Sequence, residues 1–147
     1  MELSEAQVQR YSRHILLPDV GGVGQKRLLA AAVSVDVSMP AAATAAVYLA
    51  AAGVGTIHLA GDVAAPVTDD DLRGGIGYGA VDRGAPRGDA LAARLRAVNP
   101  DVRVAPGGGG VRVPVDAAAA DTASALIAAG AAATRAVAAI ARGAATP

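Results

Sequence analysis

Residues 33–60 have the sequence VSVDVSMPAAATAAVYLAAAGVGTIHLA, in which two short apolar runs flank a longer alanine-rich run. The run at residues 33–37 predicts a strand. A helix is expected over residues 40–52, and Gly53 stands where a left-handed residue commonly ends a helix. Residues 56–60 predict a second strand. A crossover through a helix makes two such strands parallel, so the stretch is expected to be a βαβ unit.

The segments on either side of this unit have their own signals. An amphipathic helix is expected over Ser4–Leu17, with Ser4 as its cap and Pro18 after it. A glycine turn and a short helix over residues 25–31 should lead into the first strand. Residues 61–84 show no periodicity and predict a long loop.

The rest of the chain continues the alternation of helix and strand. Elements are expected at residues 86–98 (helix), 102–105 (strand), 111–115 (strand) and from there to about Arg142 (helix, with a break at Gly130). This order predicts a small α/β, Rossmann-like domain over residues 33–147, with a mainly parallel sheet and helices on both faces. Residues 1–32 are expected to form an N-terminal helical arm.

Composition excludes several classes of function. The chain has 147 residues and no net charge, so no global field attracts nucleic acid or an anionic membrane surface. It has no cysteine, which excludes a disulfide, a thiolate nucleophile, a zinc site with thiolate ligands and a thioester. The alanine-rich residues 117–141 contain Asp121 and Arg135, whose charges oppose a membrane span. A cytoplasmic protein is expected.

Two stretches resemble the ThiF/MoeB/HesA family of ubiquitin-activating-enzyme-like adenylyltransferases. They are RYSRHILLPDVGGVGQKRLLAA (residues 10–31) and VYLAAAGVGTIHL (residues 47–59). A weaker match, PRGDALAARLRAVNPDVRV, covers residues 86–104. The resemblance implies a Rossmann-like fold that uses ATP and magnesium to adenylate the carboxyl end of a ubiquitin-like sulfur carrier.

Several positions that bind nucleotide in the family are changed in this chain. A glycine-rich turn binds the phosphates in the family, because its backbone can approach them closely. Val37–Ala42 aligns with this turn and contains no glycine, and Pro40 has no amide hydrogen. The acid that binds the ribose aligns with Gly61, which leaves Asp62 as a neighbouring substitute.

The family's other functional positions match only in part. Arg73 matches an arginine that contacts the triphosphate, and Arg87 stands in place of the catalytic lysine. The acidic run Asp69–Asp71 beside Arg73 is expected to be a solvated loop. No counterpart of the family's metal-binding motif is found, so no metal site is expected.

One functional position of the family is retained in the arm. The resemblance implies that Arg13 reaches the ATP phosphates of a neighbouring subunit, where an arginine stabilises developing negative charge. A purely structural explanation is that residues 10–17 pack the arm onto their own domain.

These observations lead to one hypothesis and two rivals. The hypothesis is a degenerate ThiF/MoeB-like protein without a cofactor of its own, which acts as a homodimer or with an active relative in the activation of a sulfur carrier. The first rival is an active adenylyltransferase whose rebuilt site uses Arg13, Asp62, Arg73 and Arg87. The second is a structural or regulatory protein that binds no carrier.

Overall fold

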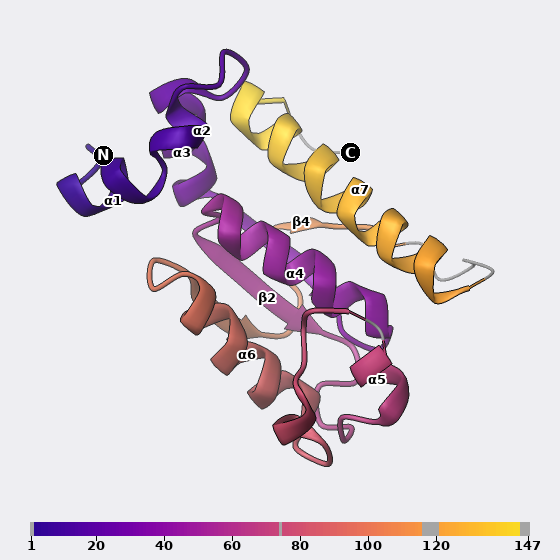
Figure 1. The fold of residues 1–147 in the computed structure, drawn as a ribbon. Coiled ribbons are helices and arrows are strands. Elements are labelled where there is room, and N and C mark those ends of the chain that lie inside the picture. The colour runs from indigo at the N-terminus through magenta and orange to yellow at the C-terminus, as the bar shows by residue number, and fades with distance from the viewer. Residues whose placement is uncertain (1, 74, 116–120, 145–147) are drawn as a thin grey trace.

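The computed structural model describes residues 2–73, 75–115 and 121–144. The chain has an α/β fold, in which helices pack on a β-sheet (Figure 1). Four parallel strands lie in the order β3-β2-β1-β4. The strands are β1 (Ala32–Asp36), β2 (Thr56–Ala60), β3 (Arg103–Pro106) and β4 (Val111–Arg112). The helices are α1 (Glu5–Arg10), α2 (Ser12–Ile15), α3 (Gly21–Ala30), α4 (Pro40–Ala52), α5 (Asp69–Arg73), the 3-10 helix η1 (Ala80–Asp82), α6 (Arg87–Val98) and α7 (Thr122–Arg142).

The expected βαβ unit is confirmed in β1, α4 and β2. Val33 pairs with Ile57 and Val35 pairs with Leu59, and these four side chains are buried. Gly53 ends α4 at φ 89°, and a Cβ atom added there would lie 2.4 Å from the side-chain nitrogen of Gln25. Only glycine meets both demands, so the helix must stop where the alanine run stops.

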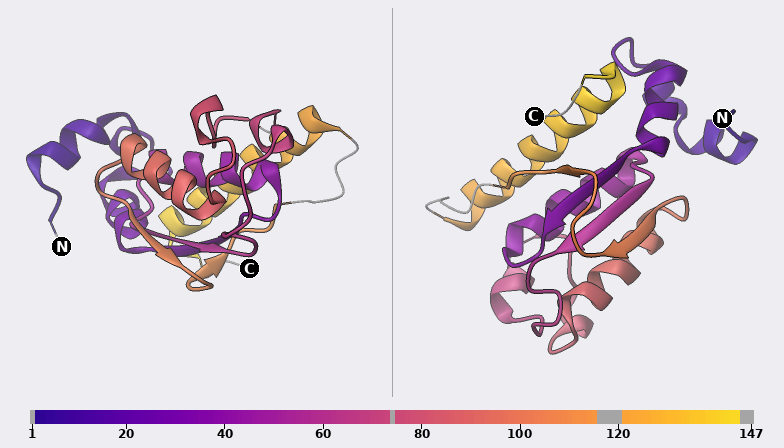
Figure 2. Two further views of the ribbon diagram at one scale, coloured as in Figure 1. Left: turned by 90° about the horizontal axis from the view of Figure 1, so that it is seen from below. Right: turned by 180° about the vertical axis from the view of Figure 1, so that it is seen from behind.

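The helices that pack on the sheet lie on one of its faces, which differs from the expectation of helices on both. Seen along the sheet, α4, α6 and α7 stand on the same side of the strands (Figure 2). The buried valines of β1 face this layer, whereas Ser34 and His58 alternate with them and project from the other face. Within the described residues no helix covers that second face.

The connection from β3 to β4 explains part of this difference. It consists of Gly107–Gly110 and must cross about three strand spacings, roughly 14 Å, so it is too short to include a helix. The crossovers from β1 to β2 and from β2 to β3 move across the sheet in one direction, and this connection moves in the opposite direction. A right-handed crossover in the opposite direction passes over the opposite face of the sheet. A Cβ added to Gly109 would lie 2.7 Å from the His58 ring, and the strand-to-strand connection therefore lies directly on the sheet.

The N-terminal helices differ from the predicted ones in their bounds. Ser4 caps α1 and forms a capping box with Gln7, as its position suggested. The expected single helix, however, is interrupted at Tyr11, where α1 ends and α2 follows. The glycines expected to form a turn are inside α3, which begins at Gly21.

The arm is held to the carboxyl end of α4 by a buried polar cluster. The Tyr11 hydroxyl donates to Asp101 Oδ2 (3.0 Å) and accepts from Asn99 Nδ2 (2.8 Å), which also donates to the Ala50 carbonyl (2.7 Å). Gln25 Nε2 donates to the Ala52 carbonyl (3.1 Å). Gln25 thus satisfies a carbonyl of the last helical turn, and Asn99 adds a second donor to the Ala50 carbonyl, which also accepts the Gly53 amide. Family-like residues of the arm are therefore part of the packing of this chain.

The last helix, α7, is continuous through Gly130 and packs against α4 and α3. Its 21 residues have a window of mean hydropathy 1.6, so by length and composition alone it could cross a membrane. Helices in the cores of soluble proteins can be equally apolar, but only 22% of this apolar stretch is buried in the domain, including Ala129, Ala133 and Ala136.

The cluster at Tyr11 predicts a difference between two tyrosines. Tyr11→Phe removes a buried hydroxyl that makes two hydrogen bonds, and should lower the free energy of unfolding by about 1–2 kcal/mol. Tyr48 is 48% exposed, so Tyr48→Phe should change it by less than about 0.5 kcal/mol. Urea denaturation monitored by circular dichroism measures both. Equal effects would show that the cluster does not hold the arm.

The same residue predicts how stability depends on alkaline pH. Burial, more than its neighbours, raises the pKa of Tyr11, although the hydrogen bond from Asn99 opposes the shift. A raised pKa means that the neutral phenol favours folding below its unfolded pKa of about 10, and that this contribution is lost as the pH rises through the folded pKa. Above about pH 10 the wild type should therefore lose more stability than Tyr11→Phe. Parallel slopes in urea melts across this range would contradict the assignment.

Candidate functional site

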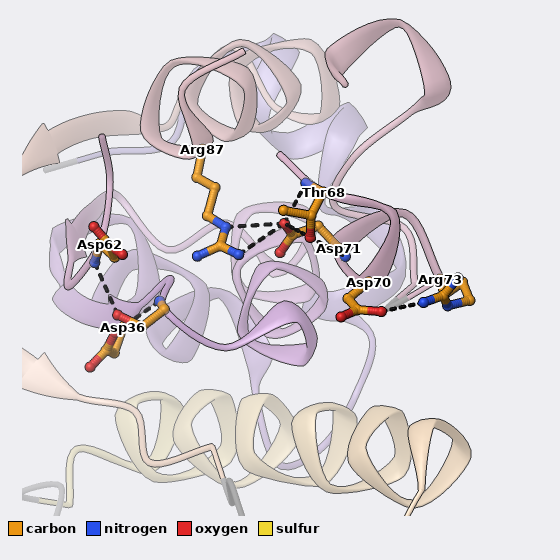
Figure 3. Close-up of polar contacts among 8 residues, drawn as sticks. Asp36, Asp62, Thr68, Asp70, Asp71, Arg73 and Arg87 are labelled. Carbon is orange, nitrogen blue, oxygen red and sulfur yellow. Dashed lines mark hydrogen bonds and ion pairs between the residues drawn. The ribbon is translucent and has the colours of Figure 1, made fainter. Parts of the chain in front are cut away.

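The turn between β1 and α4 is closed by side chains of its own. Asp36 ends β1, and its Oδ1 accepts a hydrogen bond from the Ser38 amide (3.0 Å). The Ser38 hydroxyl in turn accepts one from the Asp62 amide (3.0 Å) after β2 (Figure 3). The hydrogen bonds from the amide and hydroxyl of Ser38 hold the pKa of Asp36 below its usual value, so the carboxylate is charged at neutral pH.

The amides of residues 37–42 leave little capacity to bind an anion. Val37 donates to the Ala60 carbonyl, Ser38 donates to Asp36, and Ala42 donates to Met39. Pro40 has no amide hydrogen. Along this turn of the described chain, the Met39 and Ala41 amides have no hydrogen-bond acceptor. A phosphate cradle needs several amides that converge on one point, and this turn lacks such a set.

Asp62 lies next to this turn and is itself exposed. Its amide is engaged by Ser38, and its carboxylate adds a second negative charge beside Asp36 at the carboxyl edge of the sheet. The preceding Gly61 has φ 78°, and a Cβ there would lie 2.0 Å from Asp36 Oδ1. The two aspartates therefore belong to one compact, acidic turn.

Arg87 is committed to an internal ion pair. At the first position of α6, it donates through Nε (3.1 Å) and an Nη (3.0 Å) to Asp71 Oδ2. The amide and hydroxyl of Thr68 donate to the same oxygen at 2.8 and 2.9 Å. The Asp71 side chain is fully buried and that of Arg87 is 13% exposed. This arrangement fastens the segment after β2 to α6.

The burial of Asp71 corrects the prediction that residues 69–71 form a solvated acidic loop. Asp69 and Asp70 are exposed, whereas Asp71 faces inward from α5, which occupies part of the expected loop. Removing one partner of a buried ion pair costs about 3–5 kcal/mol, so the segment is well fixed. Sequence reasoning missed this contact because it depends on α6 meeting α5.

Tyr78 lies in the same region as the ion pair. Its hydroxyl and the Asp71 Oδ1 atom are buried and have no partner among the described residues. Burial, followed by the charge of Asp71, raises the pKa of Tyr78, so the phenol stays neutral at physiological pH.

Arg73 and Arg13 lie away from the turn. Arg73 ends α5, and its exposed side chain pairs with Asp70 (Figure 3). Arg13 is exposed on α2, which belongs to the arm at the carboxyl end of α4, whereas the turn lies at the amino end. A helix of 13 residues is about 20 Å long, so Arg13 does not reach the turn of its own chain.

The four predicted site residues therefore do not converge within one chain. Asp62 joins Asp36 through Ser38, Arg87 joins Asp71, Arg73 joins Asp70, and Arg13 is remote from all three. Among the residues that the structure describes, no three acidic or histidine side chains are grouped to hold a metal ion. The role of Asp36 was missed, although a charged residue at the end of an apolar strand is a visible signal.

Known proteins resemble most of the chain in sequence. The chain is 42% identical over 103 residues, 69% of its length, to the "Probable adenylyltransferase/sulfurtransferase MoeZ" of Mycobacterium tuberculosis. It is 39% identical over 106 residues to the "SAMP-activating enzyme E1" of Haloferax volcanii, and 35% identical over 102 residues to the "Sulfur carrier protein ThiS adenylyltransferase" of Escherichia coli. It spans 26%, 38% and 40% of these relatives. No family model matches the chain.

Solved structures resemble the fold. The tRNA N6-threonylcarbamoyladenosine dehydratase TcdA of E. coli, in complex with ATP, matches 76% of the chain with a TM-score of 0.64 at 24% identity, and the chain covers 44% of it. The structure of PaaA matches 71% of the chain with a TM-score of 0.64 at 28% identity, and the chain covers 34% of it. In the order of its elements and in the sequence of its matched part, the chain belongs to the ThiF/MoeB family.

Proposed function

We propose that the chain is a ThiF/MoeB-type protein that does not adenylate by itself and acts as a dimerisation or accessory partner in the activation of a ubiquitin-like sulfur carrier. The observation that supports this most is the Asp36 carboxylate in the turn between β1 and α4. It accepts from an amide that a phosphate would need, and it carries the charge that a phosphate would carry.

Electrostatics support the absence of a triphosphate site at this turn. Two like charges about 4 Å apart repel by about 1 kcal/mol in water and several times more near a protein surface. Asp36 and Asp62 lie on either side of Ser38 and place two negative charges at this turn (Figure 3). Arg87 and Arg73 are engaged elsewhere, with Asp71 and Asp70, and the charge of Arg112 acts on Asp36 rather than on an added phosphate alone.

The arm supports a role through association. Arg13 is exposed on α2, and the arm also exposes the apolar side chains of Leu16 (82%), Leu17 (51%) and Val8 (47%). Large apolar side chains gathered on one exposed segment commonly mark a contact with another protein. In a homodimer, or in a heterodimer with an active relative, a partner that covers this surface would have Arg13 close to its own nucleotide site.

The relatives suggest the pathway. One is named for adenylating the sulfur carrier ThiS, and another for activating SAMP. We extend their type of substrate to the partner complex, with ATP and magnesium held by the active subunit. The chain itself then needs no cofactor, no nucleic acid and no membrane, and it functions in the cytoplasm.

The first prediction of this proposal concerns nucleotide binding. Isothermal titration of the purified chain with ATP and magnesium should show no binding in the micromolar range, because the turn lacks converging amides and carries Asp36. An active relative titrated in parallel serves as the control. Micromolar binding together with carrier-dependent release of pyrophosphate would instead establish the chain as an active adenylyltransferase.

The second prediction concerns Arg13 in the complex with an active relative from the same cell. Arg13→Ala should lower the partner's adenylation rate by roughly 10²-fold, the typical effect of removing one group that stabilises developing charge. Assembly, measured by size-exclusion light scattering, should be unchanged.

Arg94→Ala is the matched control, because Arg94 is also an exposed helical arginine but lies on α6. Its adenylation rate should equal that of the wild type. If Arg13→Ala has the same rate as Arg94→Ala in a complex that is fully assembled, Arg13 has no part in the mechanism.

A further inference from the structure

A small pocket lies at the carboxyl ends of β1 and β4. Its volume is about 310 Å³, and it is lined by Asp36, Met39, Arg112, Val113, Pro114 and Val115. In the sheet, β2 lies on one side of β1 and β4 lies on the other. The pocket is therefore at the topological switch point, where successive connections go to opposite sides of β1. Open α/β sheets bind their ligands at this position.

The size of the pocket favours a ligand smaller than a nucleotide. Small-molecule sites commonly range from about 300 to 1,000 Å³, and this pocket lies at the lower limit. A molecule with a few heavy atoms beyond its two charged groups would fill it.

The pocket carries one charge of each sign. Arg112 pairs in register with Ser34, two residues before Asp36 on the neighbouring strand, so both side chains project from the same face of the sheet. Arginine is always protonated in proteins. The hydrogen bonds from Ser38 keep the pKa of Asp36 low, so Asp36 is ionised as well.

Within the described residues the two side chains form no ion pair, although the charge of Arg112 contributes to the lowered pKa of Asp36. In the described part of the chain the ion pairs are Arg10–Asp101, Arg73–Asp70, Arg83–Asp69 and Arg87–Asp71, and neither Asp36 nor Arg112 belongs to one. Both side chains line the pocket, so a ligand bound there would meet both of them. The remaining lining residues are Met39, Val113, Pro114 and Val115; Val113 is buried, so the other three offer apolar surface to an aliphatic group.

We propose that this pocket binds a small zwitterion of the α-amino acid class, with its ammonium group at Asp36 and its carboxylate at Arg112. A ligand with both charges would pair both side chains, whereas a ligand with one charge would leave the other side chain unpaired. The proposal goes beyond the accessory role and does not depend on it, because it involves neither Arg13 nor a partner subunit.

Three ligands with related alkyl chains test the proposal on the purified chain. Norvaline carries both charges, pentanoate lacks the ammonium group, and butylamine lacks the carboxylate. Isothermal titration should give an affinity for norvaline at least tenfold higher than for either of the other two. Glycine and alanine, which share the charged groups, identify the contribution of the aliphatic part. If norvaline, glycine and alanine all bind no more tightly than pentanoate, the proposal is wrong.

Two variants locate the site. Arg112→Gln changes an exposed side chain at the short edge strand and should lower the affinity for the zwitterion at least tenfold without altering the circular dichroism spectrum. Asp36→Asn should do the same and should leave the affinity for pentanoate unchanged. Arg103→Gln, at an exposed arginine of β3, is the matched control and should bind like the wild type. Equal binding by Arg112→Gln and Arg103→Gln would overturn the assignment even if Asp36→Asn failed to fold.

Discussion

The packing of Tyr11, Gln25 and Asn99 around the carboxyl end of α4 is the contact on which the arrangement of the molecule depends. Gly53 ends the helix in the left-handed conformation. The side-chain amides of Gln25 and Asn99 donate hydrogen bonds to the carbonyls of Ala52 and Ala50, respectively. The segments that meet here come from the arm, from α4 and from the loop after α6. Their union fixes the arm at one end of the domain, opposite the carboxyl edge of the sheet, and so separates Arg13 from the turn at Asp36.

The two ends of α4 differ in how far they keep the residues of the family. At its carboxyl end the buried polar contacts are complete, and the family-like residues of the arm and of residues 47–59 take part in them. At its amino end Val37–Ala42 stand where the family binds phosphate, and the hydrogen bonds of Ser38 with Asp36 and Asp62 close this turn. A fold can be preserved by packing while a site is lost, because the core and the site depend on different side chains.

The layer of helices on one face agrees with the pattern of the strands. Parallel strands that are covered on both sides are commonly apolar throughout, but β1 and β2 alternate between buried aliphatic residues and Ser34, Asp36, Thr56 and His58. The second face therefore tolerates contact with the glycine connection and with water. We expected two helical layers because the order of elements is typical of the doubly wound fold, and the alternation was the signal that could have corrected this.

Local sequence was sufficient for the βαβ unit, for the helix over residues 87–98 and for the resemblance to the family, because glycine caps, helical periodicity and strand-length apolar runs act within a few residues. It was also sufficient to notice that the phosphate turn lacks glycine. Only the tertiary structure decided that Asp71 is buried with Arg87, that Asp36 accepts a hydrogen bond from the Ser38 amide, and that Asp36 and Arg112 line one pocket. Each of these depends on the distance between side chains that are brought together by the packing of separate elements, and no local pattern encodes such a distance.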